Sequence, residues 1–225
     1  MTQVLVLAEG QTEETFLKEV VAPYLHPFGV SLAITVLKTK RVVNAPDFKG
    51  GISSYSQLQR DLRLLLANKH SFPVTTMIDF YGLPSESPGI KDMPVGDCYT
   101  KVAHVERNIE KDFNDRRLHV YLELHEFEAF AFVDPKLLLQ LYPSEEAAIK
   151  KLSAVRAAHE TPEHINLGAE TAPSKRIVKE LKRYKKAIDG PSLAVELGVD
   201  MLCRSCKHFG EWIAWLKSLE LSNAS

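Results

Sequence analysis

Three groups of carboxylates each follow a short apolar run, a spacing that suits metal-dependent phosphoryl transfer. The acids are Glu9, Glu13, Asp79, Glu123, Glu126 and Glu128. Each apolar run has the composition of a buried parallel strand, and in open α/β sheets binding sites form at the carboxyl ends of such strands. If the strands are neighbours, the carboxylates converge, repel one another and require a cation. Ligand oxygens of this kind suit Mg²⁺ or Mn²⁺.

Two of these acids also have a purely structural interpretation. Glu13 lies in the first turn of a predicted helix, where a negative charge is favourable. Asp79 can cap the loop after its strand. Glu9 has no such role, and a carboxylate just past a buried strand is costly unless it is paired or metal-bound. We therefore expect Glu9, Glu13 and Asp79 to be metal ligands. Glu126, with Glu123 as the second choice, would complete the cation site or act as a base.

Histidine and cysteine residues offer weaker signals. His125 stands between acids that favour its charged form, so it is a candidate proton carrier, although a lone histidine is more often structural. Cys203 and Cys206 form a single C-x-x-C. A structural zinc site usually takes four ligands and no second C-x-x-C exists, so we interpret this pair as reduced thiols.

Composition and charge place the chain among ordinary globular proteins. It has 225 residues, 45% of them hydrophobic and 25% charged, enough for one substantial domain or one with a small annex. The net charge of −1 supplies no overall basic field, so nucleic acid would need a local patch. No apolar run reaches the roughly 18 residues of a membrane-spanning helix, and the N-terminus lacks a signal-peptide pattern. We expect a cytoplasmic protein that does not bind membranes.

Apolar periodicity alternates between strand-like and helix-like segments in the first half. Strands are expected at 3–8, 32–38, 74–79 and 118–124, and helices at 12–25, 55–68 and 98–116. This alternation predicts an α/β fold with a parallel sheet sandwiched by helices. From residue 134 onward only helices and loops are predicted. We therefore expect an α/β domain over residues 1–133, with a helical C-terminal region over 134–225 packed on it.

A basic segment is predicted to form one helix over residues 174–188. Its cations are Lys175, Arg176, Lys179, Lys182, Arg183, Lys185 and Lys186. The lysines that would share one face of such a helix are Lys175, Lys179, Lys182 and Lys186. Lys175 and Arg176 at its start, where backbone N–H groups also favour phosphate, are the candidate phosphate-binding residues. The plainer interpretation is a solvated basic face.

With these residues assembled, the chain resembles Toprim-type proteins, which include topoisomerases, primases, recombination factors and OLD-family nucleases. In the Toprim pattern, a Glu after the first strand and an Asp-x-Asp after a later strand hold Mg²⁺. Glu9 matches the first acid and Asp79 the first Asp. Glu13 matches a further metal-binding acid of OLD-like members. Tyr81 stands where the second Asp would be, which departs from the pattern.

Nearly the whole chain also resembles a bacterial family of Toprim-like proteins of unknown function. The motifs that carry this resemblance are E-G-Q-T-E-E, K-G-G-I-S-S-Y, I-D-F-Y-G-L-P, E-L-H-E-F-E-A, A-P-S-K-R-I and C-K-H-F-x-x-W. The resemblance implies a Toprim-like fold and genes that lie beside those of AAA or SMC/ABC-type ATPases. It therefore implies a role in phage or mobile-element defence or in DNA repair.

Three functions stay open on these grounds. The favoured one is a Mg²⁺-dependent phosphoryl-transfer enzyme that acts on nucleic acid, foremost a nuclease. The second is a non-catalytic partner of an AAA or SMC/ABC-type ATPase, which the Tyr81 departure favours. The third is a small-molecule phosphatase or phosphotransferase. The sequence does not distinguish DNA from RNA, and a homo-oligomer is compatible with all three.

Overall fold

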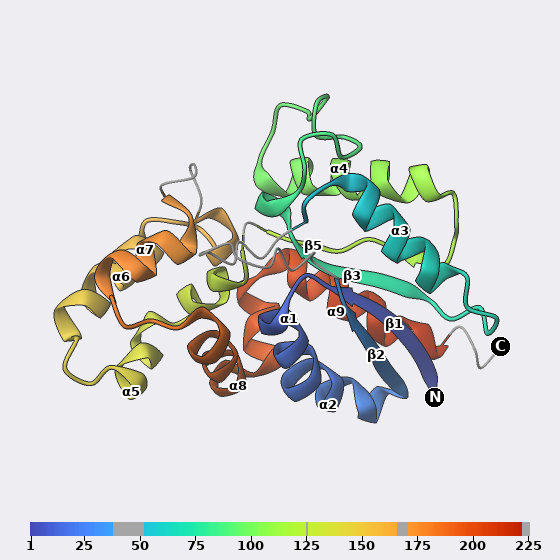
Figure 1. Cartoon of the computed structure of the whole chain (residues 1–225). Helices are drawn as coiled ribbons and strands as arrows, with labels where there is room; N and C mark the ends of the chain where they lie inside the picture. The colour runs from blue at the N-terminus through green and yellow to red at the C-terminus, as the bar shows by residue number, and fades with distance from the viewer. Residues whose placement is uncertain (38–51, 125, 166–170, 222–225) are drawn as a thin grey trace, which may run out of the picture.

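The structure, a computed structural model, describes residues 1–37, 52–124, 126–165 and 171–221, and it confirms the α/β fold (Figure 1). Within these ranges five strands form one sheet: β1 (Thr2–Ala8), β2 (Val30–Val36), β3 (Val74–Asp79), β4 (Leu118–His119) and β5 (Leu122–Glu123). The order is β2-β1-β3-β4, with β5 also beside β3, and every pairing is parallel. The three strands that precede the acids, β1, β3 and β5, are therefore consecutive neighbours.

The predicted strand at 118–124 is interrupted, which corrects the expectation of one continuous strand. Between β4 and β5, side chains replace ladder hydrogen bonds. The Val120 N–H donates to Glu110 Oε1 at 2.9 Å, and the Tyr121 N–H donates to Thr76 Oγ1 at 3.0 Å. Pairing with β3 resumes at β5, where Leu122 lies beside Ile78 and Glu123 beside Asp79. The Leu122 N–H still donates to a side chain, the Glu106 carboxylate, at 2.8 Å.

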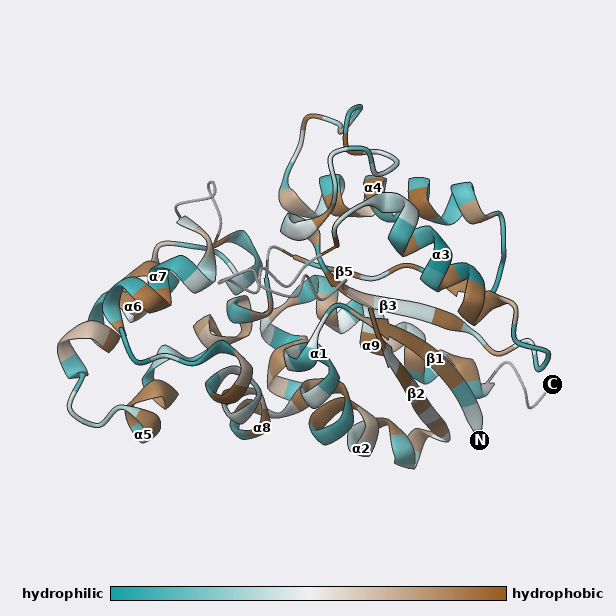
Figure 2. Cartoon of the chain, viewed as in Figure 1, coloured by the Kyte–Doolittle hydropathy of each residue, from teal (hydrophilic) through white to brown (hydrophobic). Residues whose placement is uncertain are grey.

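Helices cover both faces of the sheet, as Figure 1 shows. On one face, α1 (Gln11–Phe16) continues through a π-helical turn into α2 (Ala22–Leu25), beside α8 (Lys186–Ser205) and α9 (Lys207–Leu221). The other face is covered by α3 (Tyr55–Leu66) and α4 (Cys98–Phe113). The strands are largely apolar, and the helices place hydrophobic residues toward them (Figure 2). Burial of this apolar surface on both sides is what stabilises a parallel sheet.

The helical C-terminal part has a core of its own next to the sheet. It contains α5 (Leu138–Leu141), α6 (Glu146–Ala157), α7 (Pro173–Glu180) and the first turns of α8. Short 3₁₀ turns at Phe127–Phe132 and Pro135–Leu137 precede α5, and another at Pro162–His164 lies between α6 and α7. Among the described residues, no helix combines the length and apolarity needed to cross a membrane.

The prediction of a single basic helix over residues 174–188 is wrong. Helix α7 ends at Glu180, a non-helical segment follows, and a new helix begins at Lys186. Leu181 and Tyr184 in this segment are buried in the core of the helical part, so packing overrides the helix propensity of the lysine-rich sequence. Lys186 therefore starts α8 and does not share a helix face with Lys175.

A buried network joins the last helix to the sheet. The Glu163 carboxylate accepts the backbone N–H groups of His208 and Phe209, each at 3.1 Å, at the start of α9. His208 Nε2 lies 2.9 Å from Glu106 Oε1, the same oxygen that accepts the Leu122 N–H of β5. Glu106 therefore holds β5, the strand that carries Glu123, against the start of α9.

Candidate metal centre

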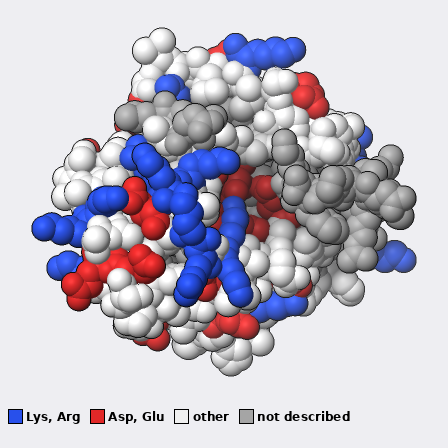
Figure 3. Space-filling view, turned by 60° about the vertical axis from the view of Figure 1, so that its left-hand side comes forward, with Lys and Arg blue, Asp and Glu red and all other residues white. Residues whose placement is uncertain are grey.

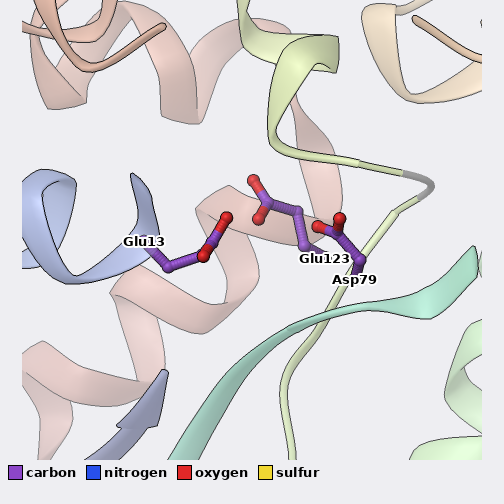
Figure 4. Close-up of side chains that lie close together, drawn as sticks. All are labelled: Glu13, Asp79 and Glu123. Carbon is purple, nitrogen blue, oxygen red and sulfur yellow. The ribbon is translucent and has the colours of Figure 1, made fainter. Parts of the chain in front are cut away.

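Three carboxylates converge beyond the ends of adjacent strands. One ligand oxygen from each of Glu13, Asp79 and Glu123 lies within 4.8 Å of the others, and Figure 4 shows the side chains turned toward one another. Asp79 ends β3, Glu123 ends β5, and Glu13 lies in the first turn of α1. Opposite oxygens on one Mg²⁺ lie about 4.2 Å apart, given bonds of about 2.1 Å. The spacing and the all-oxygen donor set therefore fit a single hard divalent ion.

The glycine before α1 permits this approach. A Cβ at Gly10 would lie 3.2 Å from Oε2 of Glu13, a tighter approach than about nine in ten Cβ contacts in proteins. Gly10 is also the N-cap of α1 and makes no side-chain cap, so the chain turns from β1 directly into the helix. The E-G-x-x-E spacing thus brings the first helical turn against the end of the strand.

Glu123 is the acid whose environment is hardest to explain without a ligand. It is 2% exposed, and neither carboxylate oxygen has a hydrogen-bond partner among the residues described. Burial, and then the nearby charge of Asp79, raise the pKa of Glu123 well above its usual value. An ionised carboxylate in such a place costs several kcal/mol or more unless a cation pairs with it.

Glu9 and Asp79 are joined through the backbone. The Asp79 N–H donates to Glu9 Oε2 at 2.9 Å, which links the end of β3 to the residue after β1. Burial is the main reason that the pKa of Glu9 rises to about 7, with Glu13 adding to the rise and the hydrogen bond opposing it. Burial also raises the pKa of Asp79 well above its usual value. Glu9 borders the group of three carboxylates and holds the backbone of Asp79 in place.

Sequence reasoning did not identify Lys186 as a site residue. Its Nζ lies 2.9 Å from Glu128 Oε2 and 3.6 Å from Asp79 Oδ2. Glu128 is fully buried in the 3₁₀ turn after β5, and burial raises its pKa while Lys186 opposes the rise. A helix that begins at residue 186 would have indicated Lys186, but the continuous run of basic residues predicted one helix through this position.

Glu126 makes a different contact from the one expected of a metal ligand. Its Oε2 accepts the Ser174 N–H at 2.9 Å, at the start of α7. This carboxylate occupies a helix N–H that was expected to favour phosphate. The Lys175 side chain is exposed, whereas Arg176 Nε donates to the Thr171 carbonyl at 2.7 Å. The structure thus brings Lys175 and Arg176 to the helix start but gives Arg176 a local backbone partner.

The remaining residues of interest in the sequence are His125, Tyr81, Cys203 and Cys206. His125 falls outside the residues that the structure describes, as does part of the K-G-G-I-S-S-Y motif. Tyr81 lies in a turn after β3, and it is 47% exposed. Cys203 and Cys206 are free thiols, as expected.

One face of the molecule carries both acidic and basic side chains. Figure 3 shows acidic side chains in a hollow, with Lys and Arg side chains gathered beside it. The exposed cations of α7 and the segment after it, here called the basic edge, are Lys175, Lys179, Lys182, Arg183 and Lys185. A divalent ion in the hollow would therefore lie next to a surface that attracts a polyanion.

Comparison with known proteins assigns the family. Residues 8–217 match the family described as a domain of unknown function (DUF4276). The chain belongs to this family. No curated protein and no solved structure matches the chain. The DUF4276 match begins at the end of β1 and runs into α9, so it includes all three members of the carboxylate group.

Proposed function

We propose that this DUF4276 protein is a Mg²⁺- or Mn²⁺-dependent phosphoryl-transfer enzyme that acts on nucleic acid, foremost a nuclease. The observation that carries the proposal is Glu123, a buried carboxylate with no described hydrogen-bond partner that faces Asp79 and Glu13. Three acids in this arrangement destabilise the metal-free protein unless they are protonated or bound to a cation. The resemblance of Glu9, Glu13 and Asp79 to Toprim acids supports the same chemistry.

The chain has residues that could bind a divalent ion, orient one of its ligands and attract a phosphodiester. A divalent ion, once bound, would polarise the phosphate and lower the pKa of a coordinated water. Glu13, Asp79 and Glu123 would hold that ion, and Glu9 would orient Asp79 through its backbone N–H. The side chains of the basic edge would attract and position the phosphate backbone, as Lys and Arg do in sequence-independent binding.

One observation favours the alternative of a non-catalytic partner of an AAA or SMC/ABC-type ATPase. Lys186 already neutralises part of the acidic group, and Tyr81 supplies no second acid. In that case the carboxylates would form a structural cluster, and the protein would act through its surface. Phage or mobile-element defence and DNA repair are the settings that the resemblance suggests for either role.

Cleavage assays with the purified protein separate these functions. We expect labelled single-stranded and duplex DNA and RNA to be cut in Mn²⁺ or Mg²⁺ and not in EDTA. Glu123→Gln should lose the activity, while Glu196→Gln, at an exposed site on α8, should keep it. Hydrolysis of a small phosphomonoester without cleavage of nucleic acid would favour the hypothesis of a small-molecule phosphatase. Absence of cleavage, with an ATPase partner present as well as absent, would favour the partner role.

A further inference from the structure

We propose that Lys186 occupies the position of a second metal ion, so that the site binds one divalent ion beside one ammonium group. This inference rests on the proposed metal site and extends it to the number of ions. Enzymes that use two ions hold them about 4 Å apart, bridged by a shared carboxylate. In this chain a lysine contacts the carboxylate that would serve as that bridge.

The two oxygens of Asp79 face different surroundings. Oδ2 lies 3.6 Å from Lys186 Nζ, whereas Oδ1 is buried and has no hydrogen-bond partner within the described part of the chain. Asp79 is also a member of the group of three carboxylates with Glu13 and Glu123. One side of Asp79 is therefore neutralised by the protein itself, and the other is left for an ion.

Glu128 has the environment of a ligand to a second cation. It is fully buried, and its Oε2 lies 2.9 Å from Lys186 Nζ. Lys186 makes both of the ion pairs that the described residues form with Asp79 and Glu128. A divalent ion in place of the ammonium group would lie between the same two carboxylates.

The location of Lys186 is otherwise unfavourable. It is the first residue of α8, where the helix dipole repels a positive charge. Its partners, Asp79 and Glu128, come from the end of β3 and the turn after β5. The ion pairs across these elements explain why a lysine occupies a helix start.

Calorimetric Mn²⁺ titration of the full chain tests the proposal by stoichiometry. We expect one ion per chain for the wild type. Lys186→Gln should bind a second ion, because the amide keeps a hydrogen-bond donor near Glu128 but removes the charge. Lys185→Gln is the matched control, since Lys185 is the exposed neighbour with the same charge, and it should bind one ion. Adding Glu128→Gln to Lys186→Gln should return the stoichiometry to one.

Each outcome decides the proposal, and thermal melts establish that every variant is folded. Two ions in the wild type, or a single ion in folded Lys186→Gln, would overturn the role of Lys186 and leave the metal site intact. Binding by Lys186→Gln alone would show that the lysine fills the only cation site, which also overturns it. No binding by any form would overturn the proposed function together with this inference. Lys186→Met replaces the glutamine variant if the latter does not fold.

Discussion

Asp79 and Glu123 are direct register partners in the parallel pairing of β3 and β5. Residues opposite each other in a ladder project to the same side of the sheet, so these two carboxylates lie side by side beyond the last apolar pair. Like charges at such positions are destabilising. The fold therefore imposes the repulsion, and a bound cation is the simplest means of relieving it.

Neutralising Glu123 should separate metal binding from folding. We expect Glu123→Gln to keep or raise the melting temperature of the metal-free protein, because a buried and unpartnered carboxylate is replaced by a neutral amide. The wild type should gain about 2.7 kcal/mol at Mn²⁺ concentrations near 100 times Kd, or about 5–10 °C, and the variant should gain nothing. Thermal melts with and without Mn²⁺ measure both effects. A large fall in the metal-free melting temperature would identify Glu123 as a structural residue.

The stability of the metal-free protein should fall as pH rises from about 4.5 to about 7. The pKa of Glu9 is about 7 in the folded chain against 4.5 in the unfolded chain, so the folded state binds more protons in this window. Stability therefore decreases with pH, by at most about 3 kcal/mol for this group. Asp79 and Glu123 have raised pKa values and act in the same direction.

Urea unfolding at several pH values measures this slope. Glu9→Gln should make the slope shallower, because one group that gains a proton on folding has been removed. Glu19→Gln, an exposed acid in the π-helical turn after α1, is the matched control and should leave the slope unchanged. Equal slopes for Glu9→Gln and the wild type would exclude Glu9 as a source of the pH dependence.

Glu126 should behave as a helix cap and not as a ligand. Its carboxylate accepts the Ser174 N–H of α7, and it lies outside the group of three carboxylates. We expect Glu126→Ala to cost about 1 kcal/mol, or about 2–4 °C, as the loss of other N-caps does. Mn²⁺ affinity should stay the same in calorimetry. A loss of Mn²⁺ binding as severe as that of Glu123→Gln would return Glu126 to the ligand set.

The sequence predicted the strands and the acids at their ends because both follow from local patterns. Apolar β-branched runs locate β1 and β3, and Asp79 is the last residue of β3. Local patterns did not predict the end of the helix at Glu180. That end depends on the burial of Leu181 and Tyr184 in a separate core. Without that break, Lys186 could not be placed beside Glu128. The choice between Glu123 and Glu126 likewise depended on which acid α7 would use as its cap.

The basic edge should bind nucleic acid through its backbone and not through base sequence. Lys175→Ala combined with Lys179→Ala removes two exposed charges of α7. We expect weaker binding to all sequences and a salt dependence flattened by about 0.9 in log–log slope per lost phosphate contact. Fluorescence anisotropy at several salt concentrations measures both. Arg63→Ala with Lys69→Ala, an exposed pair at the α3 end of the molecule, is the charge-matched control. Identical slopes for the two double variants would exclude the basic edge.

A crystal structure of the protein soaked in Mn²⁺, with the ion located by its anomalous scattering, tests the central claim most directly. We predict one ion bonded to oxygens of Glu13, Asp79 and Glu123 at about 2.2 Å, with Lys186 still beside Glu128. A map with no ion at these three carboxylates at saturating Mn²⁺, or with an ion held by other residues, would contradict it.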